Sequence, residues 1–210
     1  MTPTIIPFAE GQKRLDWLTL VAALNLGHKG PKAKINDLFL YRGADTLLSR
    51  SAWIDGMGLL TKTATIFPGN SKSGQPMVGG GVLLFDDQNG QLTATIDFHL
   101  ITKWKTAGDS LMAALALAPV GARKILIVGA GTVGKSLLEA FSAGFPDATF
   151  TIWNRSPAGA QAFADATGAV VAVDLETAVR TADIILTCTM TTEPIIKGAW
   201  LRPGQHLNMI

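Results

Sequence analysis

The chain contains 210 residues, of which 16% are charged and 48% hydrophobic, and it carries a net charge of only +2. This composition is typical of a core-rich α/β protein, and so small a charge argues against a protein that binds nucleic acid. No apolar stretch reaches the ~18–20 residues needed to span a bilayer, and the N-terminus lacks the basic start and apolar core of a signal peptide. We therefore expect no membrane association, a cytoplasmic location and, for the single cysteine Cys188 in its apolar run, a buried structural thiol.

Residues 1–95 are predicted to form one helix followed by short strands. Apolar side chains recur at spacings of three and four between Gln12 and Leu26, which predicts an amphipathic helix that Gly27 ends. Its apolar face consists of Leu15, Leu18, Val21, Ala22 and Leu26. The predicted strands are apolar runs separated by turn residues: Leu38–Tyr41, Thr46–Ser49, Leu59–Phe67, Val82–Phe85 and Leu92–Ile96. Asn89-Gly90 lies between the last two runs and favours a β-hairpin there.

From residue 99 onward, helices and strands are predicted to alternate. A helix is predicted over His99–Leu117, and Pro119 and Gly121 mark its end. The strands predicted after it are Lys124–Val128, Thr149–Trp153, Ala169–Val173, Ile184–Cys188 and Gln205–Ile210. The helices between them are predicted over Gly134–Gly144, Ala158–Thr167 and Leu175–Thr181. Such alternation with short connections favours a parallel sheet covered by helices on both faces.

The sequence therefore predicts an α/β protein with two domains. Residues 1–119 are expected to form a mixed α+β domain, and residues 120–210 a Rossmann-type parallel sheet, with the boundary near Ala118–Arg123. The last predicted strand, Gln205–Ile210, is not followed by a covering helix. Because one face and one edge of such a sheet would be left open, we expect this chain to be part of a longer protein whose sheet is incomplete here.

The stretch Lys124–Gly134 (KILIVGAGTVG) carries the sharpest functional signal. It places a G-x-G-x-x-G motif directly after an apolar strand and at the start of a helix, the context that dinucleotide binding requires. Gly129 permits the tight turn, Gly131 lets the backbone approach the pyrophosphate, and Gly134 allows close contact between helix and strand. The helix N-terminus, with the backbone N–H groups of Thr132 and Val133, would face the phosphate charge.

The end of the following strand bears on the choice of cofactor. An acid there would bond the ribose hydroxyls and repel an additional phosphate, but this chain has Asn154, Arg155 and Ser156. Arg155 and Ser156 can offer a cation and a hydroxyl donor to a 2′-phosphate, which favours NADP(H). If Arg155 is only a surface residue, either cofactor binds, so NAD(H) stays possible. Thr187 and Thr189, after the fourth strand, are candidates for lining the nicotinamide side, although an ordinary polar loop would have the same composition.

Two stretches of the first domain, Gly58–Asn70 and Asp97–Ser110, followed by the glycine motif, resemble the ornithine cyclodeaminase/mu-crystallin family in content and order. The resemblance extends from about Thr46 to Ile210. It implies a substrate-binding and dimerisation domain joined to a Rossmann domain, with substrate held at the nicotinamide. It also implies an aspartate with a catalytic role just after the last predicted strand, beyond residue 210.

The same resemblance implies roles for particular cations. The family's carboxylate-binding lysine falls on Lys62, and Lys105 stands where an arginine is usual; lysine keeps the charge but loses the bidentate fork. For an arginine expected before the lysine motif, both Arg50 and Lys34 are candidates. Asp109 replaces a small residue and is expected to contact a substrate nitrogen or a helix-terminal amide.

These features together favour NADPH-dependent reduction of a cyclic imino-carboxylate of the Δ1-pyrroline-2-carboxylate or Δ1-piperideine-2-carboxylate type. Lys62, Lys105 and Arg50 would hold the carboxylate, and no metal ion is expected. Two alternatives stay open: an ornithine cyclodeaminase that recycles bound NAD, and a mu-crystallin-like NADP-binding protein without turnover. A homodimer is expected, with a small-molecule imino or amino acid as ligand and no nucleic acid.

Overall fold

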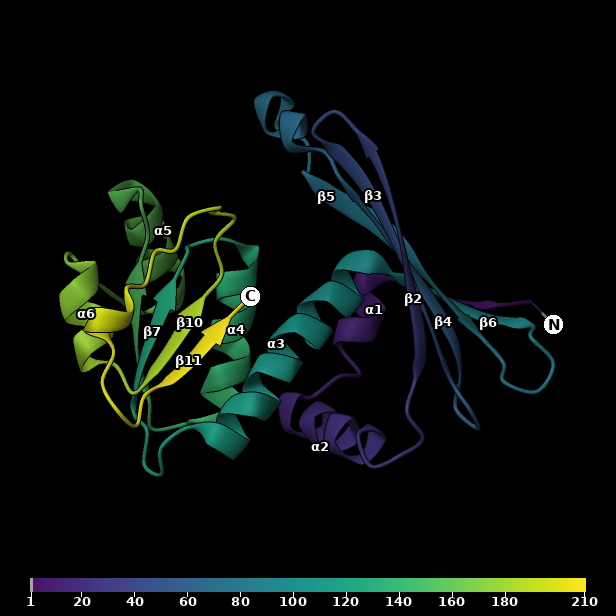
Figure 1. Cartoon of the computed structure of the whole chain (residues 1–210), viewed down its shortest axis with the longest axis horizontal. Coiled ribbons are helices and arrows are strands. Elements are labelled where there is room, and N and C mark those ends of the chain that lie inside the picture. Colours follow the sequence, from purple (N-terminus) through teal and green to yellow (C-terminus); the bar gives the residue numbers. More distant parts are fainter. Residues whose placement is uncertain (1) are drawn as a thin grey trace. The chain divides into compact units, whose positions relative to one another are not determined.

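The computed structural model describes residues 2–210, apart from the side chain of Ser71, and forms two compact units (Figure 1). One unit comprises the residues up to Asp16 together with Asn25–Lys103. The other comprises Trp17–Leu24 and Trp104–Ile210. Each unit contains one sheet, and helices accompany both, so the predicted α/β fold class is confirmed.

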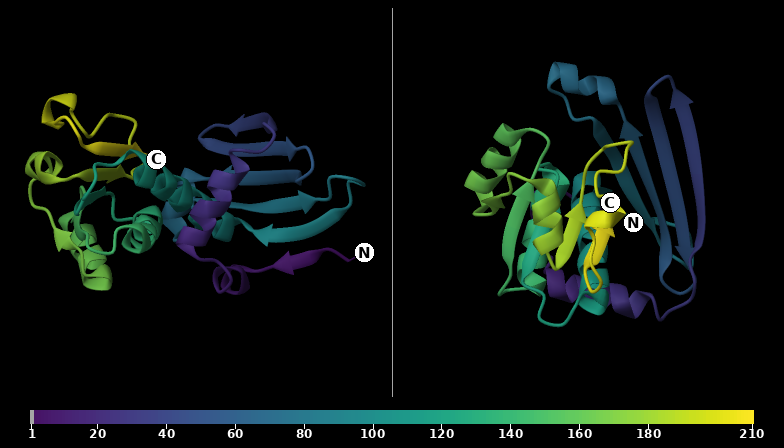
Figure 2. Two further views of the ribbon diagram at one scale, coloured as in Figure 1. Left: turned by 90° about the horizontal axis from the view of Figure 1, so that it is seen from below. Right: turned by 60° about the vertical axis from the view of Figure 1, so that its left-hand side comes forward.

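The first unit is built on a six-stranded mixed sheet with the strand order β1-β6-β5-β4-β3-β2 (Figure 2). The strands β1 and β6 run parallel, and the other neighbours run antiparallel. The elements are β1 (Thr4–Ile6), β2 (Lys34–Arg42), β3 (Asp45–Ile54), β4 (Gly58–Ile66), the 3-10 turn η1 (Pro68–Ser73), β5 (Val78–Phe85) and β6 (Leu92–Asp97). All five predicted strands are present. The strand β1 is not among the predicted ones, because three residues are too few to show an alternating pattern.

The predicted hairpin joins β5 and β6, but its connection is longer than the two-residue turn that Asn-Gly often forms. The carboxylate of Asp86 accepts hydrogen bonds from the backbone N–H groups of Gln88 and Asn89, each at 3.0 Å. Gly90 follows with φ +68, a conformation that glycine adopts without strain.

The first turns of α3 (Phe98–Leu117) cover one face of the first sheet. The sheet contributes the buried Val82 and Ala94 to this core, and α3 contributes the buried Phe98. Gly80 of β5 makes this contact possible, because a Cβ there would lie 2.7 Å from the Phe98 ring. Side chains alternate between the two faces of a strand, so every second residue of β3 and β4 points to the opposite face.

The second unit is built on a five-stranded parallel sheet with the strand order β11-β10-β7-β8-β9. Its strands are β7 (Lys124–Val128), β8 (Thr149–Trp153), β9 (Val170–Val171), β10 (Ile184–Thr187) and β11 (His206–Met209). Its helices include α4 (Thr132–Gly144), α5 (Pro157–Thr167), α6 (Leu175–Thr181) and the short η2 (Gly198–Trp200). From β7 the chain adds β8 and β9 on one side of that strand, and it then adds β10 and β11 on the other side. The strand order therefore reverses between β7 and β10, as it does at the ligand-binding point of a Rossmann sheet, and the predicted Rossmann-type parallel sheet is confirmed.

Both faces of the parallel sheet are buried. On one face, Leu126 and Val128 of β7 pack with Leu175 and Val179 of α6. The alternate residues of β7 point to the other face, where α4 packs and contributes the fully buried Phe141. β7 is therefore apolar from Ile125 to Val128, after the exposed Lys124, and its bounds agree with the predicted ones.

The helix predicted over Gln12–Leu26 is wrong at its start. The structure has a short α1 (Phe8–Gln12) and a separate α2 (Trp17–Gly27). The predicted apolar face is also partly wrong: Leu18 and Leu26 are 49% and 72% exposed, whereas Trp17 is buried. Nearly every residue of α2 is apolar, so its periodicity could not select the buried side.

The two units of the structure do not meet at the predicted domain boundary, residue 119. Both sheets lie on the predicted sides of it, but α2 and the second part of α3 belong to the second unit. Trp17 of α2 stacks on Trp104 of α3 with ring centres 3.9 Å apart. Gly108 of α3 gives close access to α2, since a Cβ there would lie 2.7 Å from Leu20. The long helix α3 is thus shared by the two units.

Candidate functional site

The glycine motif forms a tight turn between β7 and α4. Gly129 has φ +120, and a Cβ there would lie 2.7 Å from the carbonyl oxygen of Cys188. A Cβ at Gly134 would lie only 2.4 Å from the carbonyl oxygen of Gly129. Gly131 differs from both, because a Cβ there would meet nothing within 4 Å. The first and third glycines are therefore required by packing, whereas the second keeps an open space in front of the helix.

This open space could take the diphosphate of a dinucleotide. Helix α4 begins at Thr132, and its N-cap residue Gly131 provides no side-chain cap. The first N–H groups of a helix have no partner within the helix, which leaves those of Thr132 and Val133 available at this end of α4. They and the helix dipole favour an anion at this end.

A cavity of about 380 Å³ lies beside the turn, at the carboxyl ends of β7, β8 and β10. It is lined by Gly129, Ala130, Gly131, Trp153, Asn154, Arg155, Cys188, Thr189, Met190, Thr191 and Ile195. The predicted Thr189 is part of this wall. Thr187 is not in the lining; it is the last residue of β10, and its carbonyl accepts the N–H of Ile210 at 3.1 Å. Sequence reasoning assigned no role to Trp153 or Ile195, although the position of Trp153 at a strand end could have indicated one.

The side chain of Cys188 contacts the glycine turn through a hydrogen bond. Its thiol donates to the carbonyl oxygen of Gly129 at 3.2 Å. Burial raises the pKa of this thiol to about 12, which keeps it protonated at neutral pH. Cys188 is half-buried rather than buried as expected, and it lines the cavity, so its structural role stays a prediction.

The three residues after β8 differ in what they contact. The side chain of Asn154 hydrogen-bonds two backbone segments. Its Oδ1 accepts the N–H of Ala130 in the glycine turn at 3.2 Å, and its Nδ2 donates to the carbonyl of Ser156 at 3.1 Å. Ser156 is the N-cap of α5, where its hydroxyl accepts the N–H of Gly159 at 3.3 Å. Arg155 is exposed, and its guanidinium has no hydrogen-bond or ion-pair partner among the described residues. It lines the cavity and is available to an anion.

Lys62, in β4 of the first unit, is held by α3. Its ammonium donates to the Thr102 hydroxyl at 2.9 Å and lies 4.7 Å from the centre of the Phe98 ring. The Thr102 hydroxyl in turn donates to the Phe98 carbonyl at 2.8 Å. The lysine is therefore partly buried and oriented over the covered face of the sheet, unlike an ordinary surface lysine.

Arg50 lies directly opposite Lys62 on the neighbouring strand, so both point to the same face. Its guanidinium makes two hydrogen bonds to Asp37 of β2, at 2.7 and 2.5 Å. These bonds lower the pKa of the Asp37 carboxyl. The other candidate, Lys34, is exposed and lies 3.6 Å from Asp55. Arg50 is thus near Lys62, but it already has a carboxylate partner.

Lys105 and Asp109 form an ion pair one turn apart on α3. The expected contact of Asp109 with a helix-terminal amide is therefore replaced by one with Lys105, because a spacing of four brings the two side chains together. A shallow cavity beside this pair is also lined by Ser110 and Asn208. The amide of Asn208 donates to the Ser110 carbonyl at 3.3 Å and so connects β11 to α3.

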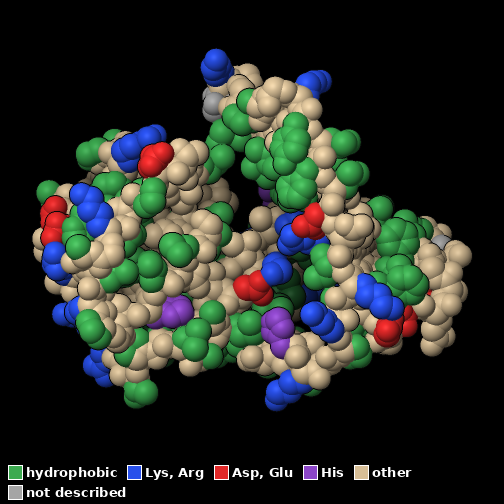
Figure 3. Space-filling model, viewed as in Figure 1, with side chains coloured by type: hydrophobic (Ala, Val, Ile, Leu, Met, Phe, Trp, Pro, Cys, Tyr) green, Lys and Arg blue, Asp and Glu red, His purple; other side chains and the backbone are tan. Residues whose placement is uncertain are grey.

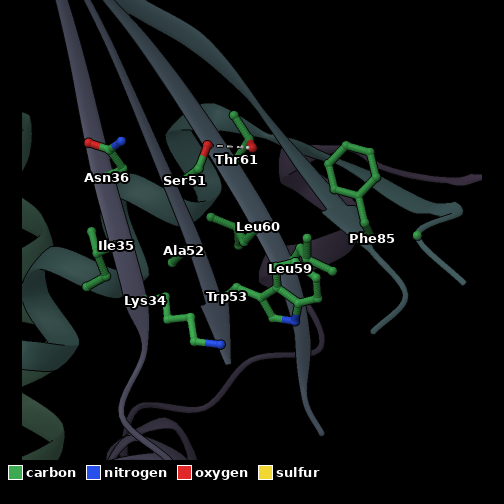
Figure 4. A pocket seen from close by; sticks show the side chains of 11 residues that line it. Lys34, Ile35, Asn36, Ser51, Ala52, Trp53, Leu59, Leu60, Thr61 and Phe85 are labelled. Atoms are coloured by element: carbon green, nitrogen blue, oxygen red, sulfur yellow. Dashed lines mark hydrogen bonds between the residues drawn. The ribbon is translucent and has the colours of Figure 1, made fainter. Parts of the chain in front are cut away.

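The uncovered face of the first sheet carries a cavity of about 420 Å³ whose lining includes Trp53, Leu59 and Phe85 (Figure 4). The Trp53 indole donates to Asp87 at 2.6 Å. Trp53 is 43% exposed, and hydrophobic side chains are visible at the surface over this sheet (Figure 3).

Membrane-spanning helices and metal-binding clusters are both absent from the described residues. None of the helices in residues 2–210 is long and apolar enough to cross a bilayer. Within the same range, no three His, Cys, Asp or Glu side chains gather in a way that could hold a metal ion.

Comparison with known proteins places these features in a family. Residues 54–210 match the model of the ornithine cyclodeaminase/mu-crystallin family. The chain is 42% identical to the Δ1-pyrroline-2-carboxylate reductase of Paracoccus denitrificans, a match that covers 99% of this chain and 68% of that protein. It is 39% identical to the mouse ketimine reductase mu-crystallin, over 72% of this chain and 49% of that protein. The chain thus spans two thirds or about half the length of these relatives.

The fold has a close counterpart among solved structures. The Δ1-pyrroline-2-carboxylate reductase of Thermococcus litoralis, solved with NADH and L-proline, superimposes with a TM-score of 0.86 at 23% identity. The match covers 99% of this chain and 68% of that one. Both the mixed sheet and the parallel sheet therefore have a counterpart in a structure whose sequence has diverged widely.

Proposed function

The chain belongs to the ornithine cyclodeaminase/mu-crystallin family, and we propose on this basis that it acts in the NADPH-dependent reduction of a cyclic imino-carboxylate. The substrate would be of the Δ1-pyrroline-2-carboxylate or Δ1-piperideine-2-carboxylate type and the product the cyclic amino acid. The observation that carries the proposal is the 42% identity to a reductase of this kind along nearly the whole chain. Residues 1–119 would be the substrate-binding and dimerisation domain and residues 120–210 the NAD(P)-binding domain.

The cofactor would bind at the carboxyl edge of the parallel sheet. The glycine turn and the N-terminus of α4 support binding of its diphosphate. Arg155, exposed at the cavity and without a partner among the described residues, supports a 2′-phosphate. Ser156 can donate its hydroxyl hydrogen to the same phosphate while its oxygen caps α5. NADP(H) is therefore the preferred cofactor in this proposal, with NAD(H) as the alternative.

Three cations would hold the substrate carboxylate: Lys62, Lys105 and Arg50. Lys62 supports this role most directly, because Thr102 and Phe98 orient its ammonium before any substrate arrives. A bound nicotinamide supplies a hydride to the carbon of the protonated C=N bond, giving a secondary amine and the oxidised cofactor. The residues of this chain contribute position and charge complementarity to that reaction.

A homodimer is part of the same proposal. The uncovered face of the first sheet, with Trp53 exposed beside Leu59 and Phe85, offers an apolar surface for a second copy. Sedimentation or light scattering of the full-length protein would measure its mass directly, and a monomer at micromolar concentration would contradict this element of the proposal.

The decisive experiment measures turnover by the full-length protein, because the chain spans 68% and 49% of the two relatives' lengths. We expect oxidation of NADPH on addition of Δ1-pyrroline-2-carboxylate or Δ1-piperideine-2-carboxylate, and slower oxidation of NADH. Release of ammonia from ornithine with catalytic NAD and no reductant would instead identify a cyclodeaminase. Tight NADPH binding without turnover of any imino acid would identify a binding protein.

A further inference from the structure

Asn154 does more than leave room for a phosphate, because its amide joins two segments of the cofactor site. It follows the last residue of β8 and contacts both the glycine turn, through Ala130, and the loop that leads into α5, through Ser156. Ala130 stands between the first two glycines of the motif. The side chain thus connects the segment that would bind the diphosphate with the segment that carries Arg155.

The hydrogen bonds require an amide in one orientation. Ala130 presents a backbone N–H, which needs an acceptor, and Ser156 presents a carbonyl oxygen, which needs a donor. Asparagine has one of each, whereas an ionised aspartate has acceptors only. An aspartate at residue 154 would keep the first bond and set two oxygen atoms against each other at the second.

A second, independent feature marks this position. Gly159 lies in the first turn of α5, where glycine is a poorer helix former than alanine. A Cβ at Gly159 would lie 2.8 Å from Nδ2 of Asn154. The glycine therefore leaves the space that the amide occupies, and an alanine would displace the amide from its place.

We infer that Asn154 is a positioning residue that fixes Arg155 and Ser156 relative to the glycine turn and thereby sets the preference for a cofactor with a 2′-phosphate. The inference rests on the proposed NADP(H) preference and assigns it a structural cause. Arg155 would make the contact with the phosphate. Asn154, supported by the space at Gly159, would hold the backbone from which that contact is made.

The test compares binding of 2′,5′-ADP and 5′-AMP, two probes that differ only in the 2′-phosphate, by calorimetry on the full-length protein. We expect the unaltered protein to prefer 2′,5′-ADP. Loss of a hydrogen bond to a charged group typically lowers affinity about tenfold or more, so Arg155→Ala should abolish the preference. Asn154→Ala and Gly159→Ala should each lower the preference at least about fivefold, and Gly159→Ala should leave 5′-AMP affinity within about twofold.

Gly159→Ala separates positioning from a general loss of structure. The better helix propensity of alanine offsets the hydrogen bonds lost when the Asn154 amide is displaced, so this variant should unfold within about 4 °C of the unaltered protein even as it loses the preference. Equal weakening of both probes by Asn154→Ala, or an unchanged preference in both variants, would overturn the inference. Absence of any preference in the unaltered protein, with no effect of Arg155→Ala, would instead overturn the NADP(H) proposal on which it rests.

Discussion

Replacement of Gly134 by alanine should destabilise the protein, although alanine is the better helix former. The new Cβ would lie 2.4 Å from the carbonyl oxygen of Gly129, and ordinary contact begins at 3.4 Å, so α4 and β7 must separate by about 1 Å. Overpacking costs about 1–3 kcal/mol, and a contact with a backbone atom, which cannot move aside as a flexible side chain can, should cost about 2–3 kcal/mol. The gain in helix propensity offsets about 1 kcal/mol of it, so we expect a net loss of about 1–2 kcal/mol, or about 2–8 °C in the unfolding temperature of a chain of this size.

Gly131→Ala provides the matched control, because a Cβ there meets nothing within 4 Å. This variant should lose about 0.5–1 kcal/mol of stability, the usual difference between glycine and alanine at an N-cap, and so less than Gly134→Ala. It should nevertheless bind NADPH much more weakly, since its methyl group fills the space in front of α4. Thermal unfolding followed by circular dichroism and NADPH titration by fluorescence measure the two effects. A Gly134→Ala protein as stable as the unaltered one, or a strongly destabilised Gly131→Ala protein, would refute the reasoning.

Three further predictions concern single side chains. In the full-length protein, Lys62→Gln should raise KM for the imino-carboxylate about tenfold or more and leave the Kd for NADPH unchanged. Steady-state kinetics would measure KM, and a cofactor titration would measure Kd. An unchanged KM would exclude Lys62 from substrate binding. Burial lowers the pKa of His206, whose Nε2 has no hydrogen-bond partner among the described residues, so the unfolded chain takes up a proton near pH 6.5 before the folded one does. Stability should therefore be full above about pH 6.5 and decline as pH falls below it; urea unfolding at several pH values should show a flatter profile for His206→Asn, and an identical profile would contradict this. With the pKa of its thiol raised to about 12, Cys188 should resist alkylation by iodoacetamide at pH 8 until urea unfolds the chain, and rapid labelling of the folded protein in a mass spectrum would show that the thiol is not protected.

The parallel sheet was predictable from the sequence because its strands are buried on both faces. In a run such as Lys124–Val128 the four residues after the exposed Lys124 are all apolar and buried, and the glycine motif fixes where the following helix starts. The helix α2 was not predictable in the same way. Its residues Trp17–Gly27 are apolar on nearly every side, and only contact with α3 selects the side that is buried.

Some residues of the candidate site were likewise predictable from the sequence, and others were not. The roles of Gly129 and Gly134 follow from the backbone alone, so the motif was sufficient to predict them. The pairing of Lys105 with Asp109 follows from their spacing of four on a helix, whereas the family resemblance implied a separate role for each residue. The contact between Arg50 and Asp37 depends on the register of β2 with β3, which no local pattern specifies.

Because Lys105 and Arg50 each form an ion pair within the chain, a carboxylate that binds either cation must compete with the carboxylate already paired with it. Each cation already holds a carboxylate of its own chain, Asp109 or Asp37, at the high effective concentration of an intramolecular partner. Binding is then an exchange of one anion for another, and its free energy is the difference between two ion pairs. Such an exchange changes the number of charge pairs little, so its affinity depends weakly on ionic strength.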